Sequence, residues 1–334
     1  MSHLPTALKK SRRLGISATL LTLALCFATL APLCGCAQPE PPANERPSIV
    51  CTIFPQFDWT RQIIGDNAGA FDLTLLINDK TDLHNYQLSV ADAVKISDCD
   101  LFIYVGGESD GWTVDLLKNA TNEKMIVISL LDLLGASAKF DETMEGMEPE
   151  EKETDEEYDE HVWLSLNNAR VFCPVIAAAL CDLDPENAGD YRDNLDAYLK
   201  QLAALDAEYQ DMTDSATEKT LLFGDRFPFR YLTDDYGITP YAAFSGCSAE
   251  TEASFDTILF LAQKTDELQL KYIIVTESAD QSIAQTIINN TEGKNQQILV
   301  LDAMQSVTSK DVQNGVSYVS IMENNLVALK EALN

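Results

Sequence analysis

Basic residues are scarce in this 334-residue chain, where 23 Lys and Arg stand against 53 Asp and Glu and leave a formal net charge of −30. Nucleic-acid binding requires a basic surface that neutralises phosphates, so this composition excludes a nucleic-acid partner. An acidic surface instead attracts cations and favours solubility. The composition is therefore typical of a protein that meets cations, although acidity alone selects no particular one.

Histidine is rarer still: there are three in the chain, and only His84 and His161 lie beyond the N-terminal leader. Both have carboxylates close by, since His84 follows Asp82 and His161 follows Asp159 and Glu160. Neutral imidazole donates a lone pair to a divalent cation, while carboxylates balance the charge. We expect both histidines to be metal ligands, against the simpler interpretation that each is a hydrogen-bonded structural residue.

The N-terminus has the features of a signal peptide. Residues 9–13 carry four basic side chains, residues 14–33 are mainly apolar, and a Pro-rich stretch follows. The junction resembles a bacterial lipobox, which implies cleavage before Cys36 and lipidation of that residue. We predict a lipoprotein signal peptide (1–35), a tether (36–47) and an extracytoplasmic protein that is lipid-anchored to the bacterial cell membrane. An ordinary secretory signal and an uncleaved anchor are the alternatives.

Five cysteines follow Cys36, and an odd number excludes full intramolecular pairing. Cys173 and Cys181 lie about 12 Å apart along a predicted helix, which is too far for a disulfide. Cys51 and Cys99 both lie near predicted strand starts, so a bond between these two stays open. We expect mostly free, buried thiols that act as small apolar residues.

Apolar runs alternate with amphipathic segments, a pattern that predicts βαβ units and parallel sheets. The predicted strands are residues 49–54, 71–77, 101–105, 125–129, 220–223, 241–244, 271–276 and 297–302. The predicted helices are residues 89–97, 112–119, 255–265, 282–290 and 318–333. The fold class is therefore α/β, with an N-terminal lobe (48–183) and a C-terminal lobe (218–334), each a parallel sheet flanked by helices.

A long helix is predicted between the lobes, at residues 184–214. Asp184 suits the N-cap and Pro185 the first turn, and apolar or aromatic residues then recur every three or four positions as far as Met212. A helix from 185 to 213 would span roughly 43 Å. It is long enough to run along both lobes and fix their spacing. The alternative is a helix packed inside one lobe.

Several motifs together resemble a known family. They are residues 82–86 (DLHNY), 97–108, 160–169 (EHVWLSLNNA), 236–238, 275–278 and 318–326. This set is similar to the cluster A-I solute-binding proteins, which deliver zinc or manganese to bacterial ABC importers. The resemblance covers nearly all of the chain beyond the leader. It implies two α/β lobes bridged by a long rigid helix, with the metal in the cleft between them.

The resemblance also implies a function and partners. We expect a receptor without enzymatic activity, most simply a monomer, that captures Zn²⁺ or alternatively Mn²⁺ and hands it to an ABC permease and its ATPase. His84 and His161 match the two histidines of the family's N-terminal lobe. Glu277 matches its acidic position after a strand of the C-terminal lobe, where ligands gather in open sheets. Asp280 is an alternative, and Glu277 as a helix N-terminal carboxylate is the simpler interpretation.

The chain departs from the family at the remaining ligand, where alignment places Arg226 or Gly224. Neither side chain ligates a cation. Three explanations stay open. Asp225 supplies an oxygen, or Cys247 enters as a thiolate, which would favour zinc over manganese. In the third, Arg226 pairs with a carboxylate or an anion and leaves fewer ligands.

Residues 141–160 include 12 acidic residues and one lysine. The simplest interpretation is a solvated, disordered loop. The functional hypothesis is an electrostatic funnel that concentrates cations at the cleft.

Two other functions remain open. A secreted zinc-dependent hydrolase would use two histidines and a carboxylate, but the chain has no His-Glu-x-x-His motif. A receptor for a metal chelate, such as a siderophore or a corrinoid, would share the long-helix architecture but would favour an aromatic or basic cleft.

Overall fold

The computed structural model describes residues 46–78, 81–148, 157–247 and 252–334. The predicted signal peptide, the lipidation site Cys36 and most of the predicted tether lie outside these residues.

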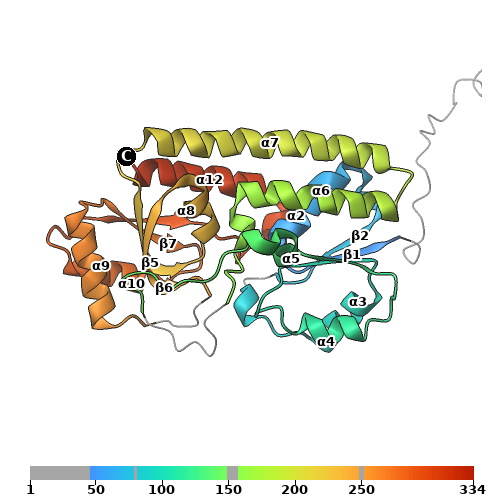
Figure 1. Ribbon diagram of the computed structural model, residues 1–334, viewed down its shortest axis with the longest axis horizontal. Coiled ribbons are helices and arrows are strands. Elements are labelled where there is room, and N and C mark those ends of the chain that lie inside the picture. The colour runs from blue at the N-terminus through green and yellow to red at the C-terminus, as the bar shows by residue number, and fades with distance from the viewer. Residues whose placement is uncertain (1–45, 79–80, 149–156, 248–251) are drawn as a thin grey trace, which may run out of the picture. The chain divides into compact units, whose positions relative to one another are not determined.

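Two four-stranded parallel sheets form the frame of the described chain (Figure 1). The strand order is β2-β1-β3-β4 in the first sheet and β6-β5-β7-β8 in the second. The strands are Ser48–Cys51 (β1), Asp72–Leu75 (β2), Leu101–Tyr104 (β3), Ile126–Ser129 (β4), Thr220–Phe227 (β5), Thr239–Ser245 (β6), Tyr272–Thr276 (β7) and Gln297–Leu301 (β8). All eight predicted strands and the α/β class are confirmed. Central strands such as β3 are apolar throughout because helices cover both faces.

Every predicted helix is present, with small differences at the ends, and the structure has four further α-helices that were not predicted. Their bounds are Phe54–Ile64 (α2), Val90–Asp98 (α3), Thr113–Lys118 (α4), Leu130–Leu134 (α5), Leu166–Leu183 (α6), Ala188–Ser215 (α7), Arg230–Tyr236 (α8), Phe255–Glu267 (α9), Ser282–Asn290 (α10), Ser309–Gln313 (α11) and Tyr318–Ala332 (α12). The predictions missed α2, α5, α8 and α11. Three of these have seven residues or fewer, too few to show a helical period.

The long bridging helix is α7, with 28 residues. It packs against α2 and α6 of the N-terminal lobe and against α8 and α12 of the C-terminal lobe, which confirms the bridge. It begins at Ala188, and Asp184 is not its N-cap, so that prediction was wrong. Asp184 instead ends α6 and accepts hydrogen bonds from Asn187 (2.7 Å) and from the hydroxyl of Tyr191 (2.6 Å).

Packing and hydrogen bonds join the two lobes. One hydrophobic core includes residues of both lobes and of α7, among them Trp59, Leu202 and Tyr318. The indole of Trp163 donates to Ala303 O (2.9 Å), and the hydroxyl of Tyr318 donates to Trp163 O (2.8 Å). Because these groups are buried, breaking the lobes apart would leave them without partners.

The described part of the acidic segment lies against the C-terminal lobe. Glu142 pairs with Arg230 (3.0 Å), and Glu148 accepts from the backbone N–H of Ser254 (2.8 Å) at the start of α9. Met147 is buried. The expectation of a solvated, disordered loop is therefore corrected at Met147 and Glu148, while Glu142 and Glu145 are exposed to solvent. Residues 149–156 lie outside the described chain, and the funnel hypothesis stays a prediction.

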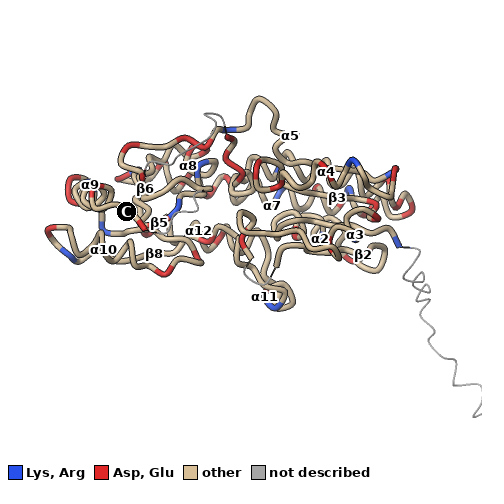
Figure 2. The backbone as a smooth tube through the Cα atoms, turned by 90° about the horizontal axis from the view of Figure 1, so that it is seen from below, with Lys and Arg blue, Asp and Glu red and all other residues tan. Residues whose placement is uncertain are grey.

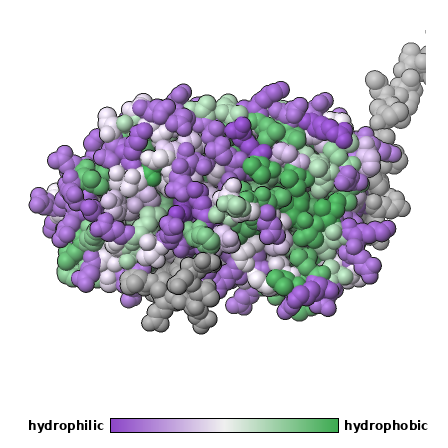
Figure 3. All heavy atoms as spheres, in the orientation of Figure 1, coloured by the Kyte–Doolittle hydropathy of each residue, from purple (hydrophilic) through white to green (hydrophobic). Residues whose placement is uncertain are grey.

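The described surface carries few cations, and apolar side chains gather on part of it. Figure 2 shows acidic residues spread along both lobes, with far fewer basic ones among them. Figure 3 shows apolar side chains gathered over α5 and α6, where Leu133 and Val171 are exposed. Helix α6 is long and apolar enough to cross a membrane, but its other face is buried in the fold.

The cysteines in the described residues are all free, and Cys51, Cys99 and Cys173 are buried. This confirms the expectation of unpaired thiols and excludes a bond between Cys51 and Cys99.

Candidate metal centre

His84 lies in a short turn that its own neighbour caps. Asp82 accepts the backbone N–H of His84 (2.9 Å) and starts the 3₁₀ turn Leu83–Asn85. Nδ1 of the ring lies 2.8 Å from Ser109 Oγ and 3.4 Å from a carboxylate oxygen of Glu160. These oxygens hold a proton on Nδ1 and leave Nε2 as the free nitrogen.

The side chain of Glu160 can approach His84 because Gly107 has no side chain in its way. At Gly107, which has a φ of +87°, an added Cβ would lie 2.4 Å from Glu160 Oε1. The same oxygen accepts the backbone N–H of Ser109 (2.8 Å). The loop after β3 therefore needs glycine at this position to orient both groups that touch His84.

His161 is fully buried and is oriented by Asp159. One oxygen of Asp159 accepts from the backbone N–H (2.8 Å) and from Nδ1 (3.0 Å) of His161. The hydroxyl of Tyr231, in the C-terminal lobe, donates to Asp159 O (3.1 Å) and so fixes the turn from the other side. A carboxylate on Nδ1 again leaves Nε2 free, the usual arrangement of metal-binding histidines.

The two free nitrogens face each other. Nε2 of His84 lies 3.1 Å from Nε2 of His161, and the ring planes are inclined by 51°. If both rings carried a proton on Nδ1 alone, two lone pairs would point at one place and repel each other. A proton or a metal ion at that place removes the repulsion.

Cys247 completes a cluster of soft donors. One ligand atom each of His84, His161 and Cys247 lies within 4.8 Å of the others, the one such group of three or more His, Cys, Asp or Glu donors among the described residues. Cys247 follows β6 after Gly246, where a Cβ would lie 3.1 Å from the ring of His161. Nitrogen and thiolate donors together suit zinc better than manganese.

The pKa values of the three donors are shifted in different directions. Burial, followed by the neighbouring His161, lowers the pKa of His84 to about 3. Burial alone would lower the pKa of His161, but the carboxylates of Asp159, Glu160 and Asp82 together outweigh it and raise that pKa. Burial, with Asp159 and Glu160 nearby, raises the pKa of the Cys247 thiol. At neutral pH the metal-free site therefore holds a proton on the thiol and none on Nε2 of His84, while the raised pKa of His161 favours its protonated form.

A glutamine that the sequence analysis missed lies at the same point. The carboxamide oxygen of Gln305 accepts from His161 Nε2 (2.9 Å), and its NH₂ donates to both carboxylate oxygens of Asp82 (2.7 and 3.0 Å) when the amide is oriented by its neighbours. Gln305 follows β8, at the carboxyl edge where ligands gather. Its place after a predicted strand was the only feature of the sequence that could have pointed to Gln305, because glutamine is not a usual metal ligand.

The other predicted ligands have different partners. Asp225 accepts the backbone N–H (3.0 Å) and the hydroxyl (2.5 Å) of Thr276. Glu277 accepts from three groups of the loop after β8, and Asp280 caps the start of α10 through Ser282 N (2.9 Å). None of these three carboxylates joins the cluster of His84, His161 and Cys247.

Arg226, at the position where the family carries a ligand, forms an ion pair. Its guanidinium donates to Asp82 (3.2 Å), as one of the three explanations proposed. Asp82 thus accepts from His84 in its own lobe and from Arg226 and Gln305 in the other. This carboxylate ties the turn that bears His84 to the C-terminal lobe.

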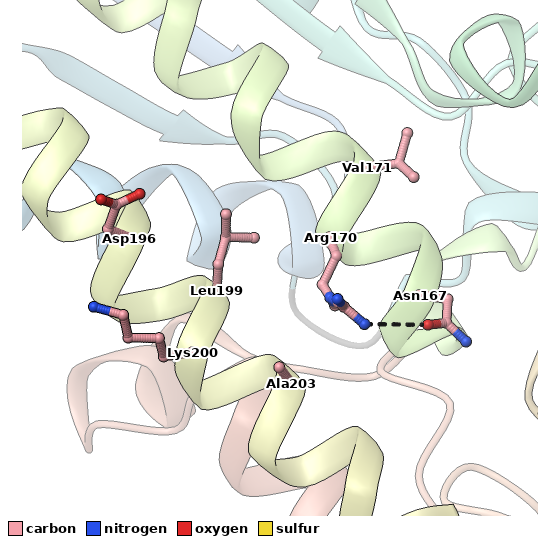
Figure 4. Close-up of a pocket in the computed structure, with 7 residues that line it drawn as sticks. All are labelled: Asn167, Arg170, Val171, Asp196, Leu199, Lys200 and Ala203. Atoms are coloured by element: carbon pink, nitrogen blue, oxygen red, sulfur yellow. Dashed lines mark hydrogen bonds between the residues drawn. The ribbon is translucent and has the colours of Figure 1, made fainter.

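A hollow of about 750 Å³ between α6 and α7 is no alternative metal site (Figure 4). It is lined by Asn167, Arg170, Val171, Asp196, Leu199, Lys200 and Ala203. It offers one carboxylate, two cations and neither histidine nor cysteine, so its chemistry does not suit a metal ion.

Comparison with known proteins gives a consistent result. A family model described as zinc-uptake complex component A, periplasmic, matches residues 49–332. The zinc-binding lipoprotein AdcA of Streptococcus pneumoniae is 31% identical over 297 residues, which cover 86% of this chain and 56% of that protein. The chain thus spans about half the length of the AdcA relatives that it matches.

Two further matches extend over nearly the whole of the other chain. The high-affinity zinc uptake system protein ZnuA of Bacillus subtilis is 27% identical over 324 residues, 94% of this chain and 97% of that protein. The crystal structure of the Zn(II)-bound ZnuA-like domain of S. pneumoniae AdcA is 29% identical, with a TM-score of 0.67 over 86% of this chain and 99% of that one.

Proposed function

This chain belongs to the family of the periplasmic component A of zinc-uptake complexes, and from that membership we propose that it is a receptor that captures zinc and delivers it to a membrane permease. It performs no chemical reaction. Its task is to bind the ion and later to release it. The named relatives are zinc-binding proteins, which supports zinc as the ligand here.

The observation that carries the proposal is the convergence of three donors. His84, His161 and Cys247 bring two nitrogens and one sulfur within 4.8 Å of one another. Such a donor set binds Zn²⁺ well and Mn²⁺ poorly, because manganese prefers oxygen. Zinc rather than manganese is therefore the proposed ligand.

Gln305 is proposed as the fourth donor. Its carboxamide oxygen lies 2.9 Å from the metal-facing nitrogen of His161. Two nitrogens, a sulfur and an oxygen make up the four ligands that zinc usually takes. Since the carboxylates of Asp225 and Glu277 are occupied elsewhere, the geometry favours Cys247 and Gln305 in their place.

The small space beside Gln305 supports a bare ion over a chelate, although His84, His161 and Cys247 do not line it. Two cavities border Gln305, and each has a volume of about 10 Å³. That is roughly the room for one water molecule. A siderophore, a corrinoid or the substrate of a hydrolase is far larger.

The cellular setting belongs to the same proposal. We place the protein outside the cytoplasm, held at the membrane through a lipid on Cys36, as a monomer that meets an ABC permease with its ATPase. The relative AdcA is named a lipoprotein, which supports the anchor.

Calorimetry tests the proposal on the chain from residue 37 onward, reduced and stripped of metal. We expect one zinc ion to bind tightly, manganese to bind far more weakly, and His84→Ala and His161→Ala to lose zinc binding. Cys247→Ser should weaken zinc binding about 10- to 100-fold. Cys181→Ser, a free thiol on α6, is the matched control and should change nothing. Manganese binding tighter than zinc, or an unaffected Cys247→Ser, would refute the proposed donor set.

A further inference from the structure

The carboxylate of Glu277 is turned toward one loop. Oε2 accepts the backbone N–H of Ala303 (2.8 Å), and Oε1 accepts the backbone N–H of Gln305 (3.0 Å) and the hydroxyl of Ser306 (3.2 Å). Three donors on consecutive parts of one loop satisfy both oxygens. Glu277 follows β7, and the loop follows the neighbouring strand β8, so the pair spans the edge of the sheet.

The loop has a conformation that needs such support. Met304 is buried and has a φ of +63°, which a residue with a side chain adopts only at a cost. Its backbone N–H donates to the side chain of Asp302 (2.7 Å). A strained residue of this kind persists when surrounding contacts hold it in place.

Contacts from two other elements hold the same loop. Asn325, on α12, accepts from Asp302 N and donates to Asp302 O, both at 2.8 Å. Trp163, two residues after His161, donates to Ala303 O (2.9 Å). The loop is therefore fixed at its start by α12 and the N-terminal lobe, and at its centre by Glu277.

The result of this turn is the placement of Gln305. The reversal at Met304 carries the chain so that the carboxamide of Gln305 meets Nε2 of His161 and the carboxylate of Asp82. If the carboxylate of Glu277 were removed, the backbone N–H of Gln305 would lose its hydrogen-bond acceptor inside the protein. The side chain would then lose its fixed position in the site.

We propose that Glu277 is a positioning residue for zinc capture, which acts through Gln305 by clamping residues 303–306 and does not touch the metal. The inference rests on the proposed function, since it assigns Gln305 an oxygen that faces the ion. It gives Glu277 a role different from the ligand that its family position suggests.

A double-mutant cycle tests this role. Zinc dissociation constants are measured for the wild type, Glu277→Ala, Gln305→Ala and the double variant. We expect each single change to weaken binding about 10- to 100-fold, as loss of a supporting contact does at metal sites. The double variant should be no weaker than Gln305→Ala, because the clamp has nothing left to position. A ligand role for Glu277 would instead make the two effects multiply, and that result would overturn the proposal.

A second measurement separates positioning from loss of fold. Cobalt(II) replaces zinc as a spectroscopic probe, and the thiolate-to-metal absorption band is recorded for each variant. Glu277→Gln, which keeps one acceptor oxygen, should fold like the wild type and shift the band in the same direction as Gln305→Ala. Glu331→Ala, an exposed glutamate bonded to Tyr272, is the control and should leave the band unchanged. An unshifted band in Glu277→Gln together with unchanged zinc affinity in Glu277→Ala refutes the clamp.

The two proposals fail in different ways. If the wild type binds no zinc, the proposed function is wrong. If the wild type binds zinc and Gln305→Ala has no effect, the receptor stands and the role of Glu277 is wrong.

Discussion

Nε2 of His84 lies 3.1 Å from Nε2 of His161, while Nδ1 of each ring is already held by an oxygen of the N-terminal lobe. The protein therefore aims two lone pairs at one point before any ion arrives. A proton on His161, whose pKa is raised chiefly by Asp159 against the effect of burial, relieves the repulsion in the metal-free state. In the proposed receptor, zinc would take the place of that proton.

Zinc binding should release protons, and affinity should rise with pH. The pKa values of Cys247 and His161 are raised in the metal-free protein, so both groups keep their protons to higher pH than usual, and zinc competes with those protons. His84, with a pKa of about 3, has no proton to lose above pH 5. We expect about one to two protons released near pH 7 and zinc affinity that falls about 10- to 100-fold per unit of acidification.

Calorimetry in buffers of different ionisation enthalpy counts these protons. Cys247→Ser should release about one proton fewer than the wild type, since its hydroxyl does not ionise in this range. Equal proton counts in the two proteins would mean that the thiol is not a ligand.

Removing the charge of Arg226 should tighten zinc binding while weakening the fold. The guanidinium pairs with Asp82, and it contributes to the lowered pKa of His84 after burial and His161, so it disfavours a second cation nearby. We expect Arg226→Met to bind zinc about 2- to 10-fold more tightly at low salt. The free energy of unfolding should fall by about 1 kcal/mol because Asp82 loses an interlobe partner.

Arg226→Lys keeps the charge and is the matched control for these measurements, made by chelator competition and urea denaturation. Weaker zinc binding in Arg226→Met would show that the ion pair matters more for holding the turn at His84 than for its charge.

The hydroxyl of Tyr318 should contribute measurably to stability. It is fully buried and donates to Trp163 O (2.8 Å) across the two lobes. Tyr318→Phe leaves that carbonyl without a partner, so we expect the free energy of unfolding to fall by about 1–2 kcal/mol. Tyr272→Phe removes an exposed hydroxyl that bonds to Glu331 and should cost less than about 0.5 kcal/mol. Urea denaturation followed by circular dichroism compares the two variants, and equal losses would contradict the interlobe role.

Glu148 should stabilise the fold in a pH-dependent way. The backbone N–H of Ser254 is the main cause of its lowered pKa. A carboxyl with a pKa lowered by folding contributes stability above its usual value of 4.5, and the contribution disappears as pH falls through the lowered pKa. Because this carboxylate is largely exposed and solvent screens its interactions, we expect Glu148→Gln to cost no more than about 0.5 kcal/mol at pH 7.

The measurement is the difference in unfolding free energy between Glu148→Gln and wild type from pH 3 to 7. It should shrink as the solution becomes more acidic. Glu145→Gln, an exposed neighbour, removes the same charge and should show no such trend.

The sequence predicted the parts of this molecule that depend on local pattern. The parallel strands were evident because buried strands are continuous apolar runs, as at Leu101–Tyr104. His84 and His161 were evident because histidine is rare here and lies among carboxylates. The start of α7 was misplaced because Asp184 is a good cap in sequence terms but bonds within a turn instead.

The rest of the candidate site depends on contacts between distant residues. Cys247 and Asp225 were equally plausible ligands until the fold placed one beside the histidines and the other on Thr276. Gln305 carried no chemical signal, and its place depends on the turn at Met304. The partner of Arg226 lies 144 residues away, a distance that no local pattern bridges.

The two sheets share one strand order, yet their contributions to the candidate centre are unequal. The N-terminal lobe supplies both histidines, and it holds Nδ1 of His84 on Ser109 and Nδ1 of His161 on Asp159. The C-terminal lobe supplies Cys247 and Gln305 from loops that follow β6 and β8. Substitutions on those two loops change the charge and softness of the donors while the nitrogen pair and both sheets stay as they are. A lineage with this architecture can thus alter its choice of metal by point substitution in one lobe, without rebuilding the fold.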